Sequence, residues 1–233
     1  NGQITVEGLS QGTYRFIETD RGADNGGYIM DGATTYEFTV TVDADGKIHY
    51  TYNNKTKDGI DINIVNEKPD ITKEVKNGDN WDHKADYSVG DLVPYQIKVS
   101  VPANITKLKT FILIDTPTNL DDKIDSVAIT ADGAAIATTA YSVAKKGTNG
   151  FKIAFEPTKM SAYAGKEIIV TYNAELLASA VTTTDGNTND ASLEYSNKIL
   201  PESTDPDKDN PNTPTTPTTP GTDKITDTTY VYT

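Results

Sequence analysis

Apolar residues occupy every second position along several short segments of this chain, and the alternation predicts β-strands. In the longest such segment, Val93, Tyr95, Ile97, Val99 and Val101 fall on alternate positions, so a strand would place all five on one face. Gly, Asp and Asn residues separate the segments, and helical periodicity is weak throughout. The pattern is typical of an all-β protein made of β-sandwiches.

The predicted strands fall into two groups, which indicates two tandem domains. Residues 1–68 contain few strands for a closed sandwich and begin as if within a domain, so we expect an incomplete domain and a chain that is part of a longer protein. Residues 69–200 contain a fuller set. Residues 201–224 are rich in Pro, Thr and Asp, which is typical of an extended linker. The strand pattern of residues 225–233 predicts either docking on the second domain or the start of a further one.

Composition and charge exclude several function classes. The chain has 233 residues and a net charge of −13, which disfavours binding to nucleic acid or insertion into anionic membranes. It contains no cysteine, which excludes disulfides, thiol catalysis and cysteine-bound metals. The two histidines, His49 and His83, lack the spacing of metal ligands. No apolar run is long enough to cross a bilayer, and we expect no cofactor.

Three strands carry a polar residue where the alternation calls for an apolar side chain. Lys73 interrupts the apolar face of "DITKEV", Asp115 ends that of "TFILID", and Asn197 ends that of "ASLEYSN". A β-bulge would shift the parity and return each residue to the surface or to a turn. If the parity holds, an amine, a carboxyl and a carboxamide face an apolar core, where isolated charges are costly and must pair or be neutralised.

Such a trio has the chemistry to form a covalent cross-link. An apolar environment favours the neutral amine of Lys73, which is a nucleophile. It also favours a neutral carboxyl on Asp115, which can hydrogen-bond the carbonyl of Asn197 and transfer protons. Attack on the carboxamide would expel ammonia and leave a Lys–Asn isopeptide bond. The fold would promote the reaction by holding the groups close together.

The segments that carry these residues resemble a known family. Residues 70–199 are similar to the isopeptide-forming domains of Gram-positive pilins and related cell-wall surface proteins, with "TKEV", "YSVGDLVPYQIKVSVPANI", "FILIDTP" and "LEYSN" in the family's order. The resemblance implies an Ig-like, Cna-type β-sandwich. It also implies that Lys73 is the nucleophile, Asn197 the electrophile and Asp115 the catalytic acid.

The first domain resembles a smaller pilin module, the collagen-adhesin B-type domain, of which residues 1–68 would be the later part. The segment "VEGLSQGTYRFIETDRGADNGGY" is similar to that module's G-L-x-x-G-x-Y-x-x-x-E-T pattern. The resemblance implies that Glu18 is the buried acid and that Asn66 provides the carboxamide for a second cross-link. The family's lysine lies on the module's first strand, and we do not find that lysine in this chain.

These features predict a structural or adhesive cell-surface subunit, part of a pilus shaft or surface stalk. The resemblance implies secretion to the cell wall and, as partners, other pilin or surface-protein subunits, sortase during assembly and host extracellular matrix. Cross-linking would occur once per chain, so we do not expect a turnover enzyme. The Y-P-K motif of sortase-acceptor lysines and the L-P-x-T-G sorting signal are not found, although Lys68 lies near the position of the former.

A second interpretation is an Ig-like binding module that recognises a host protein or glycan through its loops. The loop 77–88, "NGDNWDHKADYS", contains Trp81, whose ring can stack on a sugar. We favour the interpretation that this loop is a polar connection with one packing tryptophan.

A hydrolase with paired carboxylates is supported only by abundant Asp and Glu, which a solvated acidic surface explains. We interpret acidic residues 205–210 as solvated linker rather than a calcium site.

Overall fold

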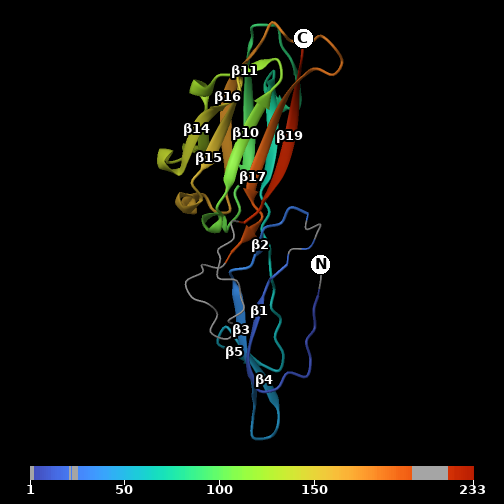
Figure 1. Ribbon diagram of the computed structural model, residues 1–233, viewed down its shortest axis with the longest axis vertical. Helices are drawn as coiled ribbons and strands as arrows, with labels where there is room; N and C mark the ends of the chain where they lie inside the picture. The colour runs from blue at the N-terminus through green and yellow to red at the C-terminus, as the bar shows by residue number, and fades with distance from the viewer. Residues whose placement is uncertain (1–2, 21, 23–25, 201–219) are drawn as a thin grey trace. The chain divides into compact units, whose positions relative to one another are not determined.

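The computed structural model describes residues 3–20, 22, 26–200 and 220–233 of the chain. Within these residues strands dominate and the only helices are five short 3-10 turns, which confirms the predicted all-β fold (Figure 1). No helix in the described part is long and apolar enough to span a membrane.

The chain divides into two compact units. The first comprises the described residues of 1–23, 30–66 and 200–217, and the second those of 24–29, 67–199 and 218–233. The division after residue 66 lies two residues before the predicted domain boundary. The predicted linker 201–224, with its acidic cluster, falls mostly outside the described residues.

The first unit contains one antiparallel sheet with the strand order β1-β3-β4-β5. Met30, Phe38 and Val40 are its buried apolar residues, and Phe38 stacks on Tyr14 and Phe16, with ring centroids 5.5 and 5.9 Å away. The strands of this unit are β1 (Gly12–Ile17), β2 (Met30–Asp31), β3 (Thr35–Val42), β4 (Ile48–Tyr52) and β5 (Lys55–Lys57).

The second unit is a sandwich of two sheets. One sheet has the strand order β14-β15-β10-β17-β19-β8, and the other has the order β13-β12-β16-β9-β6-β7, with β11 paired to β16. The strands are β6 (Asp70–Asn77), β7 (Asn80–Asp82), β8 (Lys84–Asp86), β9 (Leu92–Ser100), β10 (Phe111–Pro117), β11 (Leu120–Asp122), β12 (Ala128–Ala131), β13 (Ala134–Ala135), β14 (Tyr141–Lys146), β15 (Gly150–Phe155), β16 (Glu167–Leu176), β17 (Asn187–Ser196), β18 (Lys198–Ile199) and β19 (Thr222–Tyr232). The 3-10 turns are η1 (Ile105–Lys107), η2 (Ile124–Ser126), η3 (Thr138–Ala140), η4 (Pro157–Lys159) and η5 (Ser161–Tyr163).

The core of the second unit lies between the two sheets and follows the alternation in the sequence. In β9, the residues predicted to share a face, from Val93 to Val99, are fully buried, and Val101 just beyond the strand is buried too. Tyr95 lies opposite Tyr172 of β16, and the two rings stack with centroids 5.3 Å apart. A strand buried on one face in this way has its register fixed, because a slip of one residue would expose the whole apolar set.

The terminal strand β19 belongs to the second unit, so it docks on the second domain. It pairs antiparallel with β17 along its length, from Thr222 opposite Ser196 to Val231 opposite Asn187, and parallel with β8. Figure 1 shows β19, the last strand of the chain, beside β17. Val231 is fully buried, so this strand contributes to the core.

Replacing Val231 by Ala should lower the free energy of unfolding of the second unit by about 2 kcal/mol, because it removes buried methyl groups and leaves a cavity. Chemical denaturation followed by the fluorescence of Trp81 measures the change. Val181→Ala, at a side chain that is 39% exposed, is the matched control and should change the stability little. Equal losses in the two variants would contradict a docked β19.

Candidate functional site

A lysine and an aspartate form an ion pair in the interior of the second unit. Lys73 of β6 and Asp115 of β10 come from opposite sheets, and both side chains are 0% exposed. The Lys73 amine donates a hydrogen bond to Oδ1 of Asp115. The strands therefore keep the parity read from the sequence at both residues, without the bulges that would have turned them outward.

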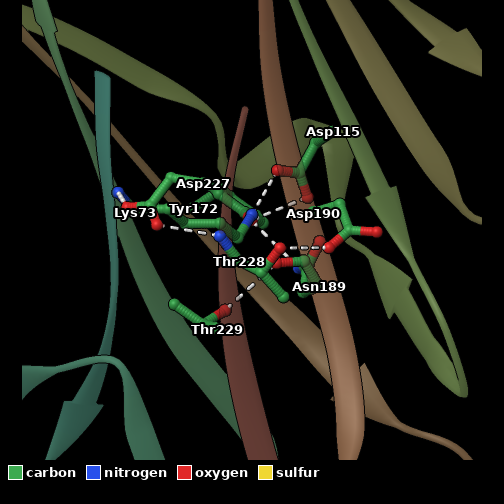
Figure 2. A network of polar contacts seen from close by, with 8 residues as sticks. All are labelled: Lys73, Asp115, Tyr172, Asn189, Asp190, Asp227, Thr228 and Thr229. Atoms are coloured by element: carbon green, nitrogen blue, oxygen red, sulfur yellow. Dashed lines mark hydrogen bonds and ion pairs between the residues drawn. The ribbon is translucent and has the colours of Figure 1, made fainter. Parts of the chain in front are cut away.

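Tyr172 of β16 connects the members of the site through its hydroxyl group. The hydroxyl oxygen accepts hydrogen bonds from the Lys73 amine at 2.5 Å and from Nδ2 of Asn189 at 3.1 Å. The hydroxyl donates to Oδ2 of Asp115 at 2.8 Å. Burial, and then the negative charge of Asp115, raise the pKa of Tyr172 well above its ordinary value, so the phenol stays protonated. Figure 2 shows the side chains of Lys73, Asp115 and Asn189 converging on Tyr172.

Asn189 of β17 is the carboxamide that lies beside the amine, and the alternation in the sequence did not identify it. It is fully buried, and its Oδ1 has no hydrogen-bond partner in the described part of the chain. In the sheet it lies opposite Pro117, two residues along from the Asp115–Ala191 pair, which makes it a diagonal neighbour of Asp115 on the same face. The buried Oδ1 is thus available to a proton donor.

The structure does not bring Asn197 to this site. Its Nδ2 donates to Oδ1 of Asp223 at 3.1 Å, and its backbone N–H donates to the carbonyl of Gly221 at 3.0 Å, so it holds the start of β19. Asn189 and Asn197 have the same parity, but eight residues of strand correspond to roughly 26 Å. Parity identifies a face of the strand and leaves the position along it open. The sequence therefore pointed to Asn197, whereas the carboxamide that the structure places beside the amine is that of Asn189.

Aromatic rings surround the amine and keep water out. Nζ of Lys73 lies 5.1 Å from the ring centroid of Tyr95 and 5.2 Å from that of Tyr172. Phe151 packs edge-on against Tyr172, with centroids 4.8 Å apart, and it is fully buried. The ring faces partly stabilise a cation through their quadrupoles, while the low polarity around them strengthens each hydrogen bond in the site.

A second carboxyl lies against Asp115. Asp122 of β11 is 6% exposed, and no hydrogen-bond donor in the described residues reaches either of its oxygens. Burial, followed by the negative charge of Asp115, raises the pKa of Asp122 to about 9, although Lys73 acts in the opposite direction. The sequence could have predicted this buried carboxyl from the segment "NLDDK", because the alternation of a strand turns one of two adjacent aspartates inward.

The terminal strand holds the backbone of the lysine. The N–H of Lys73 donates to Oδ2 of Asp227, on β19, at 2.6 Å, and Figure 2 shows this contact at the edge of the network. Asp227 also accepts from the N–H of Thr228 through Oδ1 at 2.9 Å. The position of Lys73 therefore depends on a strand that is far from it in the sequence.

The first unit brings its two predicted residues together. Nδ2 of Asn66 donates to Oε1 of Glu18 at 2.9 Å, and Asn66 Oδ1 and Glu18 Oε2 are buried without a partner among the described residues. The lysines of this unit that the structure describes lie elsewhere: Lys47 forms an ion pair with Asp58 at 3.0 Å, and Lys55 and Lys57 are exposed on β5.

The loop considered as a binding site forms two short strands, β7 and β8. Trp81 lies in β7 and is half-buried, and the amine of Lys76 lies 5.1 Å from its ring centroid. Packing therefore accounts for the tryptophan. In the residues that the structure describes, no group of three or more His, Asp or Glu side chains has the arrangement of a metal site.

Solved structures of pilins resemble this fold. The major pilin subunit BcpA of Bacillus cereus matches with a TM-score of 0.61 and 21% identity over 96% of this chain and 55% of that one. Its D312A variant matches with a TM-score of 0.63 and 19% identity, over 97% and 56%. The T6 backbone pilin of serotype M6 Streptococcus pyogenes matches with a TM-score of 0.50 and 18% identity, over 85% and 46%.

The chain thus spans about half the length of these structures. No protein-family model matches it, and no curated protein matches it. At this level of identity the likeness concerns the fold, and in that respect it agrees with the resemblance read from the sequence. The chain has the pilin-type fold of Gram-positive major pilin subunits, built from Ig-like β-domains.

Proposed function

We propose that the chain is part of a structural subunit of a pilus or surface stalk, whose second domain closes itself with a Lys73–Asn189 isopeptide bond. The pilin-type fold supports the structural role. The observation that carries the cross-link is the shared hydroxyl of Tyr172, which hydrogen-bonds both the amine and the carboxamide nitrogen in a buried site. A carboxyl that can transfer protons, Asp115, contacts the same hydroxyl.

The reaction begins with a proton transfer inside the ion pair. The proton moves from the Lys73 ammonium to Asp115, which leaves a neutral amine and a neutral acid, the forms that a site of low polarity favours. The amine attacks Cγ of Asn189, and Asp115 donates its proton to Oδ1 as the carbonyl becomes tetrahedral. Tyr172 holds the two nitrogens close together, so the reaction avoids the entropy loss of a bimolecular encounter.

Collapse of the tetrahedral intermediate expels ammonia. The surplus proton on the former amine passes through Asp115 to Nδ2 of Asn189, the Cγ–Nδ2 bond breaks, and the carbonyl reforms as its proton returns to Asp115. One amine and one carboxamide give one secondary amide and one ammonia, and Asp115 finishes as a neutral acid. Because the amine is consumed, the reaction occurs once per chain and no turnover follows.

The bond would join the two sheets of the sandwich. Lys73 lies on the first strand of the second unit, and Asn189 lies on β17 of the opposite sheet, more than a hundred residues later. Force applied between the start of the domain and β17 would then pass along covalent bonds instead of through the sheet hydrogen bonds. This suits a surface subunit with other pilin or surface-protein subunits as partners, sortase as its assembly enzyme and host extracellular matrix as a target.

Intact-mass measurement tests the bond. The wild-type protein should be lighter by one ammonia than its sequence predicts, and Lys73→Met and Asn189→Ala should restore the full mass. Asn197→Ala is the matched control and should keep the loss, because Asn197 bonds to Asp223 instead.

Two other mass results would count against the Lys73–Asn189 bond. The loss of one water in place of ammonia would assign the bond to Asp115, which the amine also contacts. The full sequence mass in the wild type would show that no link forms.

Chemical denaturation should show a large effect of the bond on stability. Cross-linking residues this far apart reduces the entropy of the unfolded chain by an amount worth about 5 kcal/mol. Asn189→Ala should therefore lower the free energy of unfolding by about that amount, whereas Asn197→Ala should cost only about 1 kcal/mol for a lost hydrogen bond. Similar losses in the two variants would count against a stabilising link at Asn189.

A further inference from the structure

Asp122 is a buried carboxyl that the cross-linking reaction leaves without a role. The backbone N–H of Asp122 donates to the carbonyl of Asn149 at 2.8 Å, and its strand pairs with β16 opposite Ala174. These bonds hold its side chain against Asp115 in the interior. Its neighbour Asp121 is half-buried and pairs with Lys123 at 2.7 Å, so its charge has a partner near the surface.

The charges of the cluster require an additional proton. The site contains one amine, on Lys73, and two carboxyls, on Asp115 and Asp122. If all three were ionised, the buried cluster would have a net negative charge and two carboxylates would face each other, which is costly away from water. A proton on Asp122 removes both problems, and the pKa of about 9 agrees with this state at neutral pH.

We propose that Asp122 is a positioning acid for cross-link formation, whose neutral carboxyl donates a hydrogen bond to Asp115 and leaves the proton of Asp115 directed at Oδ1 of Asn189. The proposal rests on the cross-linking function proposed above. A hydrogen bond donated to one oxygen of Asp115 also makes the hydroxyl on its other oxygen a stronger donor, since such bonds in a chain polarise one another. Asp122 neither gains nor loses a proton in the reaction, so the balance of atoms is unchanged.

Deprotonation of Asp122 reverses this arrangement. The Asp122 carboxylate would accept the proton of Asp115 as a hydrogen bond and turn it away from Asn189. The pKa of Asp122 is raised by burial and by Asp115, so its neutral form persists through neutral pH and is lost as the pH rises through about 9. The other ionisable groups that face it are Lys73, Asp121, Tyr95 and Tyr172. The rate of cross-linking should therefore fall on the alkaline side.

The rate of cross-linking after refolding tests the proposal. Full-length chains are translated in a cell-free reaction, captured in denaturant before they fold, and refolded at neutral pH or about one unit above the pKa of Asp122. Mass spectrometry then follows the loss of ammonia with time. The wild-type rate should fall roughly tenfold at the higher pH, in proportion to the neutral fraction of Asp122. Asp125→Asn, at a neighbouring exposed acid, should show the same fall.

Two variants of Asp122 separate its hydrogen bond from its titration. Asp122→Asn keeps a neutral donor, so it should form the link at neutral pH. Its rate of cross-linking should no longer fall at the higher pH. Asp122→Leu fills the space without a donor, so it should form the link more slowly at both pH values. An unchanged alkaline fall in Asp122→Asn, or a wild-type rate in Asp122→Leu at neutral pH, would overturn the proposal.

A direct measurement covers the case in which a variant fails to fold. The carboxyl carbon resonances of the aspartates in the folded wild type should show Asp122 protonated at neutral pH, and an ionised Asp122 would overturn the proposal. If the wild type shows no ammonia loss at all, the cross-link itself fails, and the role of Asp122 fails with it. Ammonia loss with an ionised Asp122 would instead refute only the further inference.

Discussion

The buried pair of Lys73 and Asp115 is the constraint around which the second unit is organised. Taking two charges out of water costs several kcal/mol per ion, and apolar side chains of similar volume would often stabilise such an interior better. The protein nevertheless surrounds the pair with aromatic rings and ties it to Tyr172. Stability alone does not account for this choice, whereas the proposed cross-linking reaction, which would consume the amine charge, does.

The faces of the strands were predictable from the sequence because β-strands have a period of two. Parity was sufficient to turn Lys73 and Asp115 inward, and the apolar residues that alternate with them, such as Leu113, are fully buried as well. The juxtaposition of Glu18 and Asn66 came from the family resemblance, and the structure places the two in contact. For Lys73 and Asp115 a local pattern was enough, since a single strand decides which way its side chains point.

The partners across the sandwich were not predictable in the same way. Asn189 and Asn197 lie on one face of β17 and its extension, and only the register with β10 decides which of them lies near Asp115. Asp122 required the pairing of β11 with β16, and Asp227 required the docking of β19. These are contacts between segments distant in sequence, and the alternation within one strand carries no information about them.

The dependence on distant strands also explains how the proposed irreversible bond would be compatible with correct folding. The amine, the acid and the carboxamide come from β6, β10 and β17, and the backbone of Lys73 is held by β19. Long-range pairings of this kind form late, because loop-closure entropy must be overcome before they contribute. The three groups therefore meet in a dry site only when the sandwich is complete, and a misfolded chain lacks this geometry. The proposed cross-link would thus fix the native fold selectively, since that fold alone assembles the site.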